Sequence, residues 1–204
     1  MNDNQLIKRQ GDHKNLICYR KAELIYDITY YFAHAAFLKG DRTIDQMVQA
    51  ARSGKQNIVE GNADMNTSIE MGIKLLNVAK GSLKELLSDY EDYLRVNQHR
   101  QWEESSVEFV AMRKLGKSAD NAYILSIAKT RSLDVVANMA IILIKQEDYL
   151  LHKLLESISS AFFSSLAARL YSSSFRYINA SNCLALINLG FTSNTFFNCI
   201  TAKS

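Results

Sequence analysis

The sequence predicts an all-α protein, in which an up-down antiparallel four-helix bundle is followed by a poorly structured C-terminal tail. The first indication is composition: the 204 residues include no proline and only 8 glycines, the residue types that most often end helices and form tight turns. The second is periodicity, because apolar residues recur at intervals of three and four over residues 16–158. Short polar turns separate the periodic stretches, as is typical of neighbouring antiparallel helices.

The first two helices are predicted from their apolar stripes and their ends. The first covers about residues 16–38 and ends near Gly40, because glycine readily adopts the left-handed conformation that follows a helix. Asp41 or Thr43 then offers a side-chain oxygen to the free amides of the second helix. This second helix is expected to end near Gly61.

The third and fourth helices differ in how clearly the pattern defines them. Thr67 and Glu70 have the spacing of a capping box, so the third helix is predicted to begin there and to continue to about residue 95. The pattern weakens from residue 101, where a short helix or an ordered connector is expected. A fourth long helix is predicted from about residue 118 to residue 158, and its unusual length allows for a break or a kink.

The chain therefore divides into three predicted segments: an N-terminal lead over residues 1–15, the bundle over residues 16–158 and a divergent tail over residues 159–204. Serine and asparagine become frequent in the tail, and residues 177–202 contain no Lys, Arg, Asp or Glu. Asparagines interrupt this stretch too often for a membrane-spanning helix, so no membrane association is expected. Either a lineage-specific ending or an out-of-frame ending would explain the change in composition.

The residue pattern disfavours several classes of functional site. The four histidines are isolated, and the three cysteines are scattered without a CxxC pair, so neither a metal nor a disulfide framework is expected. A GxSxG elbow and a glycine-rich phosphate loop are also missing. We therefore expect no cofactor and no enzymatic activity. The N-terminal sequence lacks the features of a secretory signal, which favours a cytoplasmic location.

Polar residues beside the buried stripe of the second helix have two interpretations. In one, Lys55, Asn57 and Glu60 line a functional site. In the other, Asn57 and Glu60 satisfy helix-end amides or bridge to Ser82 on the third helix, because buried polar groups need hydrogen-bond partners. The structural role is favoured, since polar groups often link helices inside bundles.

Basic residues of the second and third helices form a candidate nucleic-acid-binding surface. Arg52 and Lys55 are three residues apart and Lys80 and Lys84 are four apart, so each pair shares one helical face. Phosphates would lie along these cations, or else the cations are solvated and pair with nearby carboxylates. The net charge is only +3, so anion binding depends on clustering, for example in a ring of subunits. The candidate residues are Arg42, Arg52, Lys55, Lys74, Lys80 and Lys84.

Four separated motifs carry a resemblance to a known family. They are YRKA at residues 19–22, QAAR at 49–52, NIVEG at 57–61 and LNVAKGSLKE at 76–85. In this order they resemble the bacterial four-helix-bundle family named after proteins encoded in intervening sequences of 23S ribosomal RNA. Residues 16–155 are most similar to its subgroup known as the four helix bundle suffix domain.

The resemblance implies a non-enzymatic bundle that assembles as a barrel-like homopentamer. Some relatives are basic and bind nucleic acid, and one related branch is an accessory subunit of the reverse transcriptase of diversity-generating retroelements. The leading hypothesis is therefore a self-associating subunit that contacts RNA or DNA phosphates, or an accessory subunit.

Two other hypotheses belong to different classes of function. The alternative is a protein–protein interaction or structural adaptor without nucleic-acid binding, and its candidate aromatic anchors are Tyr26, Tyr30, Tyr90 and Tyr93. A third is a helical enzyme with a site shared between subunits, in which Arg52, Lys55 and Glu60 would act on an anionic substrate.

Overall fold

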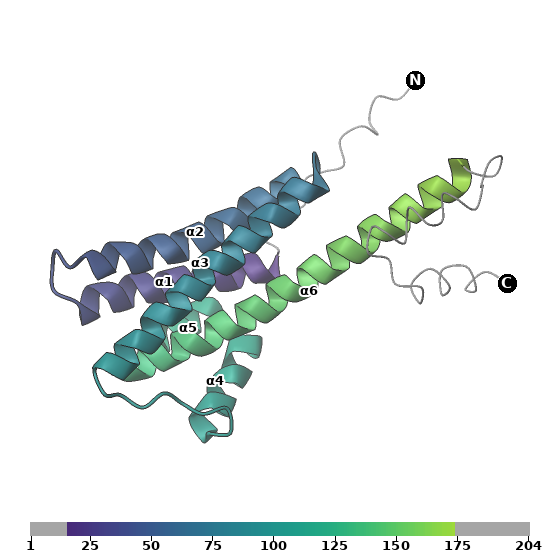
Figure 1. Cartoon of the computed structure of the whole chain (residues 1–204). Coiled ribbons are helices and arrows are strands. Elements are labelled where there is room, and N and C mark those ends of the chain that lie inside the picture. Colours follow the sequence, from purple (N-terminus) through teal and green to yellow (C-terminus); the bar gives the residue numbers. More distant parts are fainter. Residues whose placement is uncertain (1–15, 174–204) are drawn as a thin grey trace. The chain divides into compact units, whose positions relative to one another are not determined.

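The computed structural model describes residues 16–173, with side chains described as far as residue 164. Within this range the regular structure consists of six helices, so the prediction of an all-α protein is confirmed for the described part. The predicted lead, residues 1–15, and residues 174–204 of the predicted tail lie outside the described residues. The helices are α1 (Ile17–Ala36), α2 (Arg42–Asp64), α3 (Ile69–Val96), α4 (Val107–Ser118), α5 (Asn121–Ala128) and α6 (Leu133–Ser173), labelled in Figure 1.

The first three helices lie side by side and are joined by short turns, so each runs antiparallel to the next (Figure 1). The α1–α2 turn contains the left-handed glycine and the side-chain cap that were predicted for it. Gly40 has a φ of 95°, a conformation that side chains with a Cβ rarely adopt. Asp41, rather than Thr43, is the N-cap of α2, and its side chain accepts a hydrogen bond from the Thr43 amide at 2.8 Å.

The start of α3 differs from the predicted capping box by one residue. Ser68 is the N-cap, and its hydroxyl accepts a hydrogen bond from the Met71 amide at 3.3 Å. Glu70 lies in the first turn of α3, where it forms an ion pair with Lys74 at 2.9 Å. The prediction that Thr67 is the cap was therefore wrong. The adjacent Ser68 also has a side-chain hydroxyl, and it lies one residue closer to the helix.

The predicted fourth helix is not a single element. The segment expected to run from residue 118 to residue 158 contains the end of α4, the whole of α5 and the first part of α6. The break at residues 129–132 follows from tighter hydrogen bonds, because the Thr130 amide donates to the Ile127 carbonyl and the Arg131 amide donates to the Ala128 carbonyl. The helix that follows also continues beyond residue 158, to Ser173.

The core contains side chains from all six helices. Every residue of α6 from Val136 to Ile144 is buried, so this stretch has no exposed face. A helix that is apolar on all sides must be covered on all sides. Part of the cover comes from the connector between α3 and α4, whose Trp102 amide binds Asn138, and part from α4, where Leu143 lies against Gly116.

Glycines allow α2 and α3 to approach closely near their connecting turn. A Cβ added to Gly72 would lie 2.8 Å from the carbonyl oxygen of Gly61. A Cβ added to Gly61 would in turn lie 3.1 Å from the carbonyl oxygen of Gly72. The two backbones therefore touch without intervening side chains, which fixes the distance between the two helices at this end.

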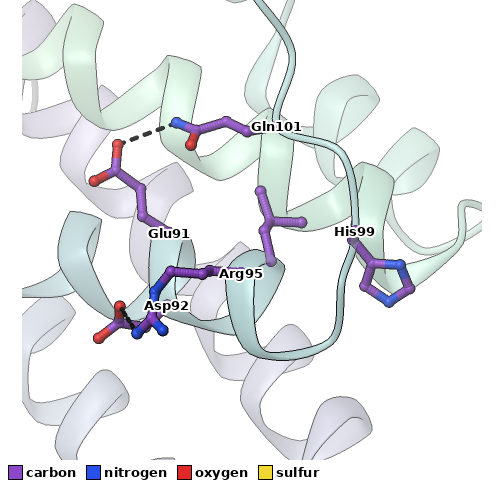
Figure 2. A pocket seen from close by; sticks show the side chains of 6 residues that line it. Glu91, Asp92, Arg95, His99 and Gln101 are labelled. Atoms are coloured by element: carbon purple, nitrogen blue, oxygen red, sulfur yellow. Dashed lines mark hydrogen bonds and ion pairs between the residues drawn. The ribbon is translucent and has the colours of Figure 1, made fainter.

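A sharp reversal at the end of α3 starts the connector to α4. Gln98 has a φ of 57°, and the amide of His99 donates to the Leu94 carbonyl at 2.8 Å. Farther along, the side-chain amide of Gln101 donates to the Glu91 carboxylate at 3.1 Å, which Figure 2 shows. These contacts turn the chain back along α3.

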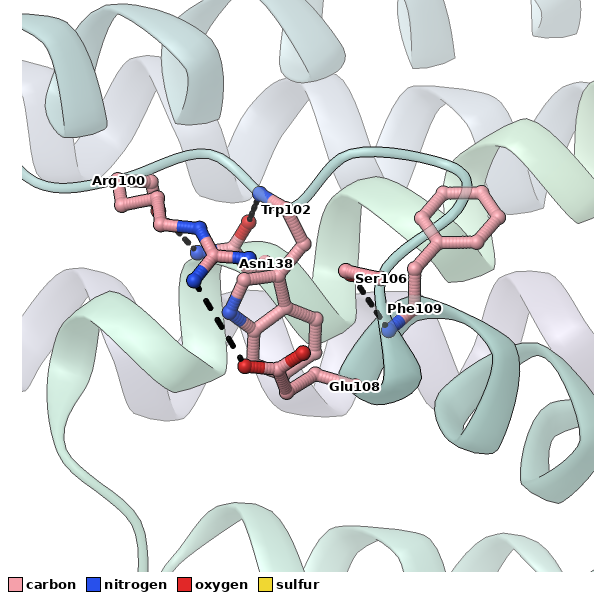
Figure 3. Close-up of polar contacts among 6 residues, drawn as sticks. All are labelled: Arg100, Trp102, Ser106, Glu108, Phe109 and Asn138. Carbon is pink, nitrogen blue, oxygen red and sulfur yellow. Dashed lines mark hydrogen bonds and ion pairs between the residues drawn. The ribbon is translucent and has the colours of Figure 1, made fainter.

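Asn138 of α6 then holds the middle of the connector (Figure 3). Its side chain is 2% exposed, and its Oδ1 accepts a hydrogen bond from the Trp102 amide at 2.8 Å. Its Nδ2 donates to the carbonyl oxygens of Arg100 at 3.0 Å and Asp134 at 2.9 Å. One buried side-chain amide therefore binds backbone groups of the connector and of α6 itself.

Replacing Asn138 by aspartate is expected to lower the free energy of unfolding by about 2 kcal/mol. The carboxylate can still accept from the Trp102 amide, but it cannot donate to the two carbonyl oxygens, which would face a negative charge instead. Urea denaturation at pH 7 measures the loss. The control is Asn77→Asp on the exposed side of α3, expected to change stability by less than about 0.5 kcal/mol. Equal losses in the two variants would contradict this role of Asn138.

Contacts divide the chain into two units, and the boundary follows Ile158. Both cavities described for this chain are lined by residues of the first unit. None of the six helices, as far as the structure describes them, has an apolar stretch long enough to cross a membrane.

Candidate functional site

The six predicted cations lie on α2 and α3, but Lys55 and Lys80 face different neighbouring helices. The Lys55 ammonium is 4.3 Å from the centre of the Tyr26 ring on α1. The Lys80 ammonium lies 3.3 Å from the Asp148 carboxylate on α6. Lys55 is therefore on the α1 side of α2, and Lys80 is on the α6 side of α3. The structure does not join them into one stripe.

Three of these cations are free and three are engaged. Lys74 and Lys80 form ion pairs with Glu70 and Asp148, respectively, and Lys55 covers an aromatic ring. The other three are exposed and have no carboxylate within 4.0 Å among the residues whose side chains are described. These free cations are Arg42, Arg52 and Lys84.

The polar residues near the middle of α2 link it to α3. The Asn57 side chain donates to the carbonyl oxygen of Ser53 at 2.8 Å and to its hydroxyl at 3.2 Å. The Ser53 hydroxyl lies 2.9 Å from the Ser82 hydroxyl on α3. Asn57 therefore reaches Ser82 through Ser53, a residue that the sequence pattern did not single out. Glu60 is exposed and is not part of this network.

Most of the candidate aromatic anchors already have partners inside the protein. Tyr90 is fully buried and donates to the Thr29 hydroxyl at 3.0 Å, and burial raises the pKa of its phenol. Tyr26 and Tyr93 are half-buried. Among these four tyrosines only Tyr30 is largely exposed, at 51%. An adaptor surface built on all four is therefore not available.

A buried polar cluster between α1 and α6 was not found from the sequence. Lys21 is 9% exposed, and its ammonium donates to the Gly116 carbonyl at 2.6 Å and to Gln146 Oε1 at 2.9 Å. Gln146 in turn donates from Nε2 to the Arg113 carbonyl at 2.7 Å. Two side chains thus tie the end of α4 to both α1 and α6.

Glu147, the neighbour of Gln146, is fully buried, and neither of its carboxylate oxygens has a hydrogen-bond partner among the described residues. Burial raises the pKa of this carboxyl well above its usual value, although the Lys21 ammonium acts in the opposite direction. Burial also raises the pKa of the Cys18 thiol to about 12, with a further contribution from Glu147. This thiol is therefore protonated and unreactive at neutral pH.

One sequence signal would have located these buried ionisable residues. Lys21 precedes the buried Leu24, Ile25 and Ile28 at intervals of three, four and seven. Glu147 follows Leu143 by four residues and precedes Leu151 by four. Ionisable residues at these spacings occupy the core face of a helix.

Beside the cluster lies a cleft of about 960 Å³, formed by the start of α1, the end of α4 and the middle of α6. Its lining contains more cations than carboxylates. The cations are Arg20, Lys21, Arg113, Lys117 and Lys145, and the acidic residues are Glu104 and Asp120. We call this feature the cationic cleft.

A smaller cavity of about 410 Å³ lies at the end of α3 (Figure 2). Its polar groups interact mainly with one another: Arg95 pairs with Asp92 at 2.7 Å, and Gln101 binds Glu91. This cavity therefore belongs to the helix end and its connector.

Within the described part of the chain, no three His, Cys, Asp or Glu side chains are grouped so that they could hold a metal ion. Arg52, Lys55 and Glu60, the residues of the hypothetical shared active site, line neither of the two cavities. Comparisons with protein-family models, with curated proteins and with solved structures find no significant match to this chain.

Proposed function

We propose that this protein is a non-enzymatic, self-associating helical subunit that binds the phosphate backbone of RNA or DNA in the cytoplasm. Its body is an up-down bundle of α1, α2, α3 and the first part of α6, to which α4 and α5 are added. Assembly into a pentamer would repeat the same cations around a ring. Repetition matters because the chain carries a net charge of only +3.

The observation that supports this proposal best is the presence of free cations on the exposed sides of α2 and α3. Arg42, Arg52 and Lys84 have no carboxylate within 4.0 Å among the described side chains, so phosphates do not have to displace an internal partner. Extended cationic side chains on helix surfaces contact phosphates without reading bases. The expected binding is therefore electrostatic and largely independent of sequence.

Binding is expected to weaken steeply with salt, because each neutralised phosphate releases condensed counterions. Fluorescence anisotropy with a labelled single-stranded RNA and a duplex DNA, from about 50 to about 300 mM salt, measures the slope. In the variant Arg42→Gln/Arg52→Gln/Lys84→Gln the slope is expected to fall by about two units.

The control for this experiment removes three exposed cations at other places, in the variant Lys39→Gln/Lys129→Gln/Arg131→Gln. Both variants have the same net charge, so a general field effect would weaken binding equally in the two. A larger loss in the α2–α3 variant supports the proposal. Equal losses, or no binding of either nucleic acid at low salt, would contradict it.

A further inference from the structure

The cationic cleft has the size of a ligand-binding site, and hydrogen bonds join the helices that form its walls. Its volume of about 960 Å³ is at the upper end of the range, about 300 to 1,000 Å³, that is typical of small-molecule pockets. Side-chain hydrogen bonds join the helices that line the cleft. Lys21 and Gln146 fix the end of α4, and the side-chain amide of Asn121 donates to the Arg20 carbonyl at 2.7 Å.

Gly116 allows this close association of α4 with α6. A Cβ at this position would lie 2.6 Å from Gln146 Oε1 and 3.0 Å from a methyl carbon of Leu143. The same Gln146 oxygen accepts from Lys21, so a larger residue would disturb the floor of the cleft. Gly116 therefore keeps the end of α4 close to α6 at the floor of the cleft.

The charge of the cleft favours an anion. Arg20, Arg113, Lys117 and Lys145 are exposed, and none of them has a carboxylate within 4.0 Å among the side chains that the structure describes. Elsewhere in the described part, Lys74, Lys80, Arg95, Arg100 and Lys153 have such partners, whereas Arg42, Arg52 and Lys84 do not. Unpaired cations from three helices around one cavity can bind several negatively charged oxygens at once.

The cleft also has an apolar side. Tyr149 and Ile17 line it and are 60% and 61% exposed, which is unusual for large apolar side chains. Deeper in the cleft, Phe109 and Ile142 are buried. A ligand that carries only charge would leave these groups in water, whereas a planar ring could cover them.

We propose that the cationic cleft binds a nucleoside phosphate, with its phosphates on the cations of α1, α4 and α6 and its base against Tyr149 and Ile17. This site is separate from the free cations of α2 and α3, and it does not depend on the backbone binding proposed above. The phosphate can come from a free nucleotide or from the terminal nucleotide of a nucleic acid.

Isothermal titration calorimetry of the full chain with ATP, adenosine and tripolyphosphate tests the two halves of the site, which are its cationic side and its apolar side. ATP is expected to bind at least about tenfold more tightly than adenosine or tripolyphosphate, because only ATP engages both halves. The variant Arg113→Gln/Lys117→Gln is expected to weaken ATP binding by about tenfold or more. In Tyr149→Ala, ATP binding weakens and tripolyphosphate binding is retained.

The matched control is Lys114→Gln/Lys129→Gln, which removes two exposed cations that do not line the cleft. It is expected to bind ATP like the unmodified chain, and so is the Arg42→Gln/Arg52→Gln/Lys84→Gln variant. Loss of nucleotide binding in the cleft is thereby distinguished from loss of binding to the phosphate backbone of RNA or DNA by α2 and α3. No heat with ATP at about 1 mM, or equal losses in the cleft and control variants, would overturn the proposal.

Competition identifies the source of the phosphate. An oligonucleotide with a 5′ phosphate is compared with the same strand bearing a 5′ hydroxyl, each titrated against bound ATP. Displacement by the phosphorylated strand alone assigns the cleft to nucleic-acid ends. Displacement by neither strand assigns it to free nucleotides. Equal displacement by both strands would show that no terminal phosphate is recognised, and would contradict the assignment to a nucleoside phosphate.

Discussion

Gly72→Ala is expected to lower the free energy of unfolding by about 3 kcal/mol, although alanine is normally the better helix former. The new methyl group would lie 2.8 Å from the Gly61 carbonyl oxygen of α2. A backbone oxygen cannot rotate away as a side chain can, so α2 and α3 have to separate at this end. Separation would loosen the packing of the neighbouring core residue Leu76. Urea denaturation monitored by circular dichroism measures the change.

Gly81→Ala, on the same helix, is the matched control. A Cβ at Gly81 has no atom within 4 Å, so the usual preference for alanine applies, and stability is expected to rise by up to about 1 kcal/mol. The two substitutions are chemically identical and should have opposite signs. A gain in stability for Gly72→Ala would show that the two backbones are not in contact.

Glu147→Met is expected to raise the free energy of unfolding by about 3 kcal/mol at pH 8. The native carboxyl is fully buried and has no hydrogen-bond partner in the described part, and methionine fills a similar volume without a charge. The ionisable groups that interact electrostatically with it are Lys21 and Cys18 on α1 and Asp148 on α6. The gain should be smaller at pH 5, where the carboxyl keeps its proton.

The sign of this pH dependence follows from the raised pKa of Glu147. Above the ordinary value of 4.5 the unfolded chain loses this proton while the folded chain retains it. The stability of the unmodified protein therefore falls as pH rises, by up to about 1.4 kcal/mol per pH unit, until the folded carboxyl also ionises. Desolvation lowers the pKa of Lys21, which has the opposite effect at higher pH.

Chemical denaturation between pH 5 and pH 8 tests this linkage. The Glu147→Met variant should have a flatter profile than the unmodified chain. Glu85→Met on the exposed side of α3 is the control, and it should preserve the original slope. Identical slopes for Glu147→Met and the unmodified chain would show that this carboxyl is already ionised and solvated.

Helices with one apolar stripe were predictable from the sequence, because a three-and-four spacing is a local property of the chain. It defined α1, α2 and α3 to within a few residues. The prediction of one fourth helix was wrong for a related reason. Its length allowed for a break, but apolar residues continue through α5 and into α6, so the pattern alone could not place the turn made by the backbone of residues 127–131.

The candidate sites were less predictable, because their parts come together only in the folded chain. Ser53 completes the link from Asn57 to Ser82, but its neighbours in sequence do not mark it as special. The cationic cleft brings Arg20 together with Arg113 and Lys145, which are far apart in the sequence. Glu147 and Lys21 did carry a local signal, since their spacing places them on apolar helix faces.

Size-exclusion chromatography coupled to light scattering tests most directly whether the chain is a self-associating subunit that carries nucleic acid. The full chain, purified at low salt, is expected to elute with about five times the chain mass of 23.1 kDa. Absorbance at 260 nm should exceed that of protein alone, and the excess should disappear at high salt or after nuclease treatment. A particle of 23.1 kDa with the absorbance of pure protein at low salt would contradict both self-association and nucleic-acid binding.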